Sequence, residues 1–187
     1  MLAYVFWHWP KADVAAQQYE TRIRTFHVAL HSAHMLGFAG SYAARMAVAP
    51  WAPSITPLYE DWYQVEDFAA LGALNESAVA AAQRAPHDDA ARAAAGGMGG
   101  VYGLRLGDPT APPGEQPHAL WFAKPSGMTY EALLTLMQPL IEQTGGALWR
   151  RQMVLGPAPE FCWRTAHAPT GIPEALLPTR IALTLVC

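Results

Sequence analysis

The first strand-like segment, LAYVFWHW at residues 2–9, carries a bulky side chain at nearly every position. Alternate residues of a β-strand point to opposite faces. One face then holds Tyr4, Phe6 and His8, and the other holds Val5, Trp7 and Trp9. Neither set suits exposure to water, so this strand must lie in a sheet that is covered on both sides.

The rest of the first half alternates between helical and strand periods. A helix is predicted from an Asp13 cap to about Met35, with Tyr19, Phe26 and Leu30 on its apolar stripe. Asp67 is predicted to cap a second helix over residues 68–85. An irregular Ala- and Gly-rich piece is expected over 86–100. The predicted strands are residues 2–9, 38–50, 57–67 and 101–107.

A Pro-rich stretch at 108–117 predicts a linker, after which the pattern starts again. HALWFAKP (118–125) repeats the aromatic strand that stops at a proline, and Thr129 or Ser126 caps the helix that follows. In place of a second helix the sequence offers only GIPEALLP at 171–178. Further strands are predicted at 147–157, 160–167 and 179–187. The expected units are repeat one at 1–107, the linker at 108–117 and a degenerate repeat two at 118–187.

This element order and its aromatic strands resemble the dimeric α/β-barrel superfamily, which includes antibiotic-biosynthesis monooxygenases, muconolactone isomerases and stress-responsive barrel proteins. The resemblance implies an α+β fold in which two ferredoxin-like βαββαβ repeats form an intramolecular barrel of antiparallel sheets around a cavity. A single chain would then meet the need for a dimer. An apolar patch left by the shortened second repeat would still allow a homodimer.

Composition excludes several classes of function. The formal net charge is −3 and no block of Lys or Arg occurs, which argues against nucleic acid and anionic membranes as partners. No apolar run is long enough for a membrane span, and the two cysteines, Cys162 and Cys187, form no paired motif. A cytoplasmic location is therefore expected. The GGMGG run (96–100) fits no nucleotide motif, and no cofactor is expected.

The candidate site residues are those that can face the space between the two sheets. His8, Glu60 and Arg45 are the candidate catalytic groups, as acid, base or anion stabiliser. A buried Glu60 or Asp61 would have a raised pKa and could serve as a base, but an exposed acid at a strand edge is the favoured interpretation of both residues. The candidate ligand-binding residues are Tyr4, Phe6, Trp62, Trp121, Trp149 and Trp163. The alternative is that these aromatic rings fill the barrel and leave no cavity.

Three histidines lie on one side of the first helix. His27, His31 and His34 fall within a narrow arc at helical spacing, so they form a weak alternative metal site. The set lacks the His-Glu-x-x-His pattern and is turned away from the apolar stripe. A polar helix flank that faces solvent or an interface is the favoured interpretation, and no metal is expected.

Three functions follow, and the sequence does not decide whether the protein is an enzyme. The first is a cofactor-independent monooxygenase or isomerase acting on a small aromatic or apolar molecule. The second is a non-catalytic ligand-binding or stress-related protein of the same fold. The third is a metal-binding protein that uses the histidine-rich helix.

Overall fold

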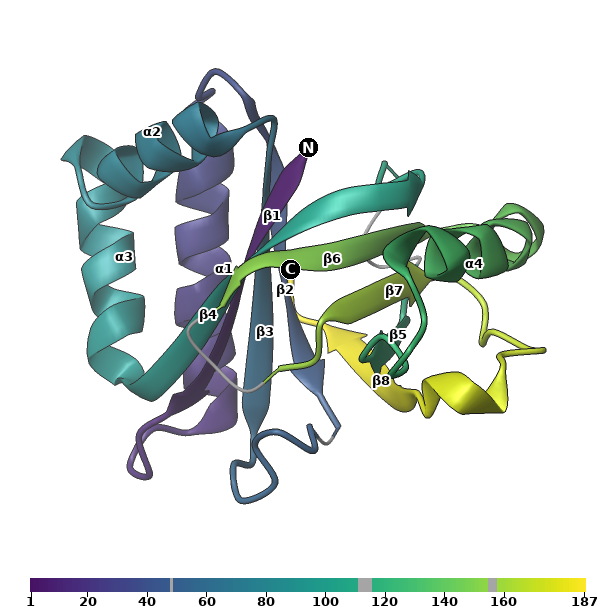
Figure 1. The fold of residues 1–187 in the computed structure, drawn as a ribbon. Helices are drawn as coiled ribbons and strands as arrows, with labels where there is room; N and C mark the ends of the chain where they lie inside the picture. The colour runs from purple at the N-terminus through teal and green to yellow at the C-terminus, as the bar shows by residue number, and fades with distance from the viewer. Residues whose placement is uncertain (48, 111–115, 155–157) are drawn as a thin grey trace.

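Eight antiparallel strands close into one barrel in the order β1–β3–β2–β8–β5–β7–β6–β4 (Figure 1). The computed structural model describes residues 1–47, 49–110, 116–154 and 158–187. The strands are β1 (Leu2–Pro10), β2 (Phe38–Met46), β3 (Leu58–Val65), β4 (Ala94–Gly107), β5 (His118–Phe122), β6 (Ala147–Val154), β7 (Phe161–Thr165) and β8 (Thr179–Leu185). The helices are α1 (Ala16–Ser32), α2 (Phe68–Ala78), α3 (Ala81–Ala93) and α4 (Tyr130–Thr144), with a 3₁₀ turn at Glu174–Leu176. The fold is α+β, as predicted.

The helix caps are partly as predicted. The Asp67 side chain accepts a hydrogen bond from Ala70 N at 2.9 Å, and Thr129 caps α4 in the same way. The predicted Asp13 cap is wrong, because α1 begins after Ala15 and no side chain caps it. The N-terminus of α1 is therefore held by packing rather than by a capping hydrogen bond.

The expected irregular piece at 86–100 is regular structure. Helix α3 continues through Pro86, and residues 94–100 belong to β4. Helix α3 packs against α1, where the Phe26 and His87 rings meet edge-on with centroids 5.4 Å apart and Arg22 pairs with Asp89 at 3.5 Å. Tertiary packing therefore outweighs the local cost of a proline inside a helix.

Aromatic rings fill the interior of the barrel. The ring centroids of Trp7 and Trp121 are 5.6 Å apart, and those of Trp62 and Trp149 are 5.5 Å apart. Tyr102 also packs edge-on against Trp121, at 5.6 Å. These rings come from both halves of the chain and are buried. The core of the barrel is thus a single packed cluster rather than two separate ones.

A buried ion pair crosses this interior. Arg164 on β7 donates to Glu60 on β3 at 2.7 Å, and the two residues are 2% and 0% exposed. Trp7 Nε1 donates to the other Glu60 oxygen at 3.0 Å. The guanidinium also lies over the Trp62 ring, 5.4 Å from its centroid. The pair links strands from the two halves of the chain.

The helices cover the barrel on two sides (Figure 1). Helices α1, α2 and α3 lie together on one side, and α4 lies on the other. Leu133, Met137 and Ile141 of α4 pack on β5 and β7, whereas Tyr19 and Ile23 of α1 pack on β3. The outer face of the barrel wall is therefore buried under helices in both places.

Three predictions include residues outside the described ranges. The linker at 108–117 includes residues 111–115, and the predicted strands at 38–50 and 147–157 include residues 48 and 155–157. Within the described ranges, no helix has the length and apolar run needed to cross a membrane.

The Glu60–Arg164 pair gives the first test. Replacing Arg164 with Met leaves the Glu60 carboxylate buried without its cation, so we expect the free energy of unfolding to fall by about 3–5 kcal/mol. Adding Glu60→Gln removes the stranded charge, so the double variant should be more stable than Arg164→Met alone. Urea titration measures the wild type, the two single variants and the double variant.

The control is Arg105→Met, which removes an exposed arginine and should change stability by less than about 0.5 kcal/mol. A double variant whose loss equals the sum of the two single losses would show that the pair is not coupled.

Candidate functional site

The pleat of β3 sends neighbouring side chains to opposite sides of the barrel wall. Glu60 and Trp62 point into the barrel, whereas Asp61 and Tyr63 point outward under α1. In β1, which pairs with β3, His8 points outward as well. Polar groups from two paired strands therefore meet the buried face of a helix.

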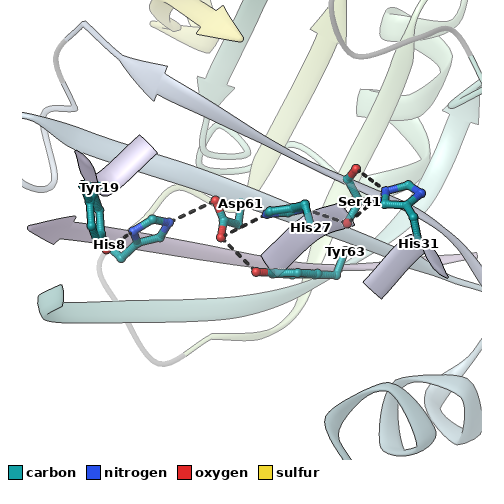
Figure 2. Close-up of polar contacts among 7 residues, drawn as sticks. All are labelled: His8, Tyr19, His27, His31, Ser41, Asp61 and Tyr63. Carbon is teal, nitrogen blue, oxygen red and sulfur yellow. Dashed lines mark hydrogen bonds and ion pairs between the residues drawn. The ribbon is translucent and has the colours of Figure 1, made fainter. Parts of the chain in front are cut away.

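Asp61 is the centre of this outer cluster (Figure 2). Its carboxylate is 4% exposed and lies between two imidazoles. Nε2 of His8 is 3.0 Å from Oδ1, and Nε2 of His27 is 3.4 Å from Oδ2. Tyr63 donates its hydroxyl to Oδ2 at 2.8 Å. Neither imidazole contact has hydrogen-bond direction, and each is an ion pair only when its imidazole is protonated.

The surroundings keep Asp61 ionised. Burial alone would raise the pKa of the Asp61 carboxyl, but His8 and His27 outweigh burial and hold the pKa well below its usual range. The raised pKa predicted for a buried Asp61 is therefore wrong. For Glu60, burial does raise the pKa, with Arg164 opposing the rise.

Tyr19 of α1 extends the cluster on the side of His8. Its hydroxyl lies 2.6 Å from Nδ1 of His8. Burial, together with the charge on Asp61, raises the pKa of Tyr19, so the phenol keeps its proton and can donate it to Nδ1 when that nitrogen carries none. In this tautomer His8 carries its own proton on Nε2, toward Asp61. Hydroxyl, imidazole and carboxylate thus lie in the order used by proton-transfer triads.

A second row of contacts leaves Asp61 on its other side (Figure 2). Nδ1 of His27 lies 2.7 Å from the Ser41 hydroxyl, and the His27 ring stacks on Tyr63 with centroids 5.3 Å apart. Nε2 of the exposed His31 lies 2.9 Å from the Ser41 carbonyl oxygen. These contacts fix the orientation of His27 and connect the buried cluster to the surface.

A cavity of about 670 Å³ lies beside this cluster, between the barrel wall and the three helices. Among the residues that line it are Tyr4, Phe6 and His8 of β1, Tyr19 of α1, and Asn75 and His87 of the two shorter helices. Most of its surface is apolar. Phe68, Val79 and Met153 line it as well and are exposed large apolar side chains, which gives the cavity an apolar rim.

The glycines of β4 make room for the floor of the cavity. Gly99 pairs with Phe6 across the two strands, and Gly97 pairs with His8. A Cβ atom on Gly99 would lie 2.7 Å from the Tyr4 hydroxyl, and one on Gly97 would collide with the Phe6 ring. The glycine run therefore leaves room for the rings of β1 to lie across β4.

The structure separates the three candidate catalytic residues. His8 lies in the outer cluster, Glu60 lies inside the barrel, and Arg45 lies at the surface. The Arg45 side chain is 47% exposed and pairs with Glu20 at 3.6 Å. The prediction that all three face one space is therefore wrong, because alternate strand residues face opposite sides of the wall.

The six candidate ligand-binding aromatics also divide. Tyr4 and Phe6 line the outer cavity. The other four do not line it: Trp62, Trp121 and Trp149 belong to the barrel core, and Trp163 packs under α4. Trp163 also donates its indole N–H to the Gly145 carbonyl at 3.1 Å.

The three helix histidines are not a metal centre. His27 is buried against Asp61, His31 contacts Ser41, and His34 lies beyond the end of α1. In the part of the chain that the structure describes, no three His, Cys, Asp or Glu side chains are placed to hold a metal ion. The predicted solvent-facing flank is wrong for His27, because α1 turns this residue toward the sheet.

Sequence reasoning missed the combination of Tyr19, His8 and Asp61. The alternation of β3 separates Asp61 from Glu60, and the helical period groups Tyr19 with the buried stripe. Neither signal shows which helix face meets which strand face. That match depends on packing between segments far apart in the sequence.

Comparisons with known proteins support the fold. No family model matches the sequence, and the search of curated proteins finds no match. A proposed monooxygenase from Lactobacillus acidophilus superposes with a TM-score of 0.60 at 8% identity, over 100% of this chain and 94% of that one. An anthrone oxidase-like protein has a TM-score of 0.51 at 10% identity, over 98% and 90%. At such identities the likeness shows a ferredoxin-like α/β barrel and no more.

The ionised state of Asp61 predicts how stability depends on pH. A carboxyl with a lowered native pKa stabilises the fold above its unfolded pKa, about 4, and loses that contribution as the pH falls further. We expect Asp61→Asn to lower the unfolding free energy at neutral pH by about 3–5 kcal/mol. The gap between wild type and variant should shrink below about pH 4. Urea titrations across this range measure it.

Asp89→Asn is the matched control, because Asp89 pairs with Arg22 at the surface. It should cost about 1 kcal/mol or less. A gap for Asp61→Asn that stays constant from neutral to acidic pH would contradict the assignment.

Proposed function

We propose that this protein is an enzyme that removes a proton from a small aromatic or apolar molecule bound in the outer cavity, as a cofactor-independent monooxygenase or an isomerase. The observation that carries the proposal is the Tyr19–His8–Asp61 row, which borders a cavity of about 670 Å³. A mainly apolar pocket with a few convergent polar groups is typical of small-molecule sites.

The row gives the proton a path. The Tyr19 oxygen accepts the substrate proton while its own proton passes to Nδ1 of His8, 2.6 Å away. His8 becomes an imidazolium, and Asp61, 3.0 Å away and ionised, stabilises that charge. Stabilisation of this kind is strong in a buried site, because little water screens the charges.

The next step separates the two reactions. In a monooxygenase, the substrate anion reacts with O₂. Anthrone is a suitable probe, because one fold neighbour is described as anthrone oxidase-like. Anthrone and O₂ give anthraquinone and water: one oxygen atom becomes the new carbonyl, and the other leaves with the two methylene hydrogens. In an isomerase, the proton returns to another atom of the same molecule and no O₂ is consumed.

The second candidate function is a non-catalytic protein that binds an apolar molecule. The exposed apolar rim of Phe68, Val79 and Met153 favours it, since such a rim suits uptake without any chemistry. This candidate needs the cavity but not the Tyr19–His8–Asp61 row, so the two candidates differ in what happens to a bound ligand.

We also propose that the chain is a tandem repeat, with units at 1–107 and 118–187 joined by 108–117. The strand order supports this. Exchanging β1–β4 with β5–β8, in sequence, reproduces the same cyclic order around the barrel. The second unit has only the 3₁₀ turn Glu174–Leu176 where the first has α2 and α3. The helices α2 and α3 that line the cavity therefore occur in the first unit alone.

Proton removal is tested with anthrone in D₂O under argon. We expect wild-type protein to speed the exchange of the anthrone methylene hydrogens above the protein-free rate, measured by NMR. His8→Gln and Tyr19→Phe should each lower this acceleration by about 100-fold, because both break the proton path. His167→Gln, on an exposed loop, is the matched control and should behave as wild type.

A second assay admits O₂ and measures its consumption together with anthraquinone formation. Uptake of O₂ that depends on His8 supports the monooxygenase. Exchange without O₂ uptake supports the isomerase. Binding without either result would reject the enzyme and favour the non-catalytic protein.

The location of the ligand is tested by filling the cavity. Gly72 of α2 lines it, and a Cβ atom there would meet nothing within 4 Å. Gly72→Leu should weaken anthrone binding at least about tenfold by occupying this space, without loss of stability. Fluorescence titration measures binding, and Ala73→Leu, on the exposed face of the same helix and outside the lining, is the control. Equal binding by all three proteins would place the ligand elsewhere.

A further inference from the structure

We infer that the outer cavity selects its ligand by charge: it takes an uncharged aromatic molecule and rejects the same ring system when it carries a carboxylate or phosphate. The inference names the substrate class of the proposed enzyme and so rests on the proposed function, although it concerns binding alone. It follows from the charges that border the cavity.

The described lining of the cavity contains an acidic side chain but no cationic side chain that is free to pair with a ligand. Asp61 is the acidic residue in this lining, and neither Lys nor Arg occurs there. His8 and His27 both lie against the Asp61 carboxylate, at 3.0 and 3.4 Å, so neither imidazole is free to pair with a ligand. His87, at the helical side, contacts Asp88 through Nδ1 at 3.1 Å, so any charge it gains is already paired. An anionic ligand therefore meets no group that is free to compensate it.

Burial makes this lack costly. An anion that enters loses its hydration and approaches a carboxylate that stays ionised, because the pKa of Asp61 is held well below its usual range. Juxtaposed like charges weaken the binding of the anion. An uncharged ligand of the same shape loses much less, since its rings replace water against Tyr4 and Phe6.

The proton step adds to the penalty. Once an uncharged substrate has lost its proton, the site holds the substrate anion, the Asp61 carboxylate and the His8 imidazolium. A substrate that entered with a carboxylate would bring a third negative charge against one positive charge. An uncharged substrate is thus favoured both when the ligand binds and when it loses its proton.

The helical side of the cavity offers neutral polar groups instead. Asn75 of α2 lines the cavity and has an amide that both donates and accepts hydrogen bonds. It suits a hydroxyl or carbonyl group on the ligand. The substrate class is therefore an uncharged aromatic molecule with an oxygen substituent directed to α2.

The test compares two tricyclic ligands that differ in charge, anthracenemethanol and anthracenecarboxylate with the substituent at the same ring position. Fluorescence titration of the wild-type protein at neutral pH and physiological ionic strength gives both dissociation constants. We expect the alcohol to bind at least about tenfold more tightly. Equal affinities, or tighter binding of the carboxylate, would overturn the inference.

Asn75→Lys places a cation at the helical side, and we expect it to reduce the preference to about threefold or less, mainly by tightening carboxylate binding. Ala73→Lys adds the same charge to α2 at an exposed position outside the lining, and should leave the preference unchanged. Because both positions are exposed, neither variant threatens the fold. An equal effect of both variants would assign the preference to overall charge and overturn the inference.

The failure of this inference is distinct from failure of the proposed function. A clear preference for the alcohol with no hydrogen exchange on anthrone supports the charge rule and rejects the enzyme. Hydrogen exchange that depends on His8, with no preference between the two ligands, keeps the enzyme and rejects the charge rule. Absence of binding by both ligands rejects the charge rule, and the exchange assay on anthrone alone then decides the enzyme.

Discussion

Two neighbouring carboxylates, Glu60 and Asp61, are buried on opposite sides of the same barrel wall, and each requires its own compensation. Inside the barrel, Arg164 of β7 pairs with Glu60 and so links the two halves of the chain. Outside, His8 of β1 and His27 of α1 flank Asp61 and so fix the helix on the sheet. The closed barrel and the helical layer thus both depend on the pleat of β3 at one dipeptide.

This arrangement places the packed barrel core and the outer cavity on opposite sides of the wall. Rings such as Trp7, Trp62 and Trp121 fill the barrel, which leaves its interior to packing and to one ion pair. The cavity with polar groups lies on the outer side of the wall, where Tyr19 approaches from α1. A change in the cavity therefore need not disturb the core that closes the barrel.

Much of the fold could be predicted from local sequence, because strand alternation and helix caps are local properties. The alternation placed Glu60 with Trp62 and Asp61 with Tyr63, and the structure confirms both pairs. The face of β1 that points into the barrel could not be predicted, since both faces carry bulky side chains and either could face inward. For the same reason His8 was assigned to the wrong side of the wall. The place of His27 depended on the rotation of α1, which only long-range packing decides.

The glycine run of β4 has a consequence for how this site can change over evolutionary time. Gly97 and Gly99 are held free of side chains by the Phe6 and Tyr4 rings that lie over them, so the sheet side of the cavity tolerates little variation. The opposite side is formed by α2 and α3, where Gly72 and Asn75 are exposed. The proposed ligand preference can therefore change by substitutions in these two helices, while His8 and Asp61 of the sheet stay in place.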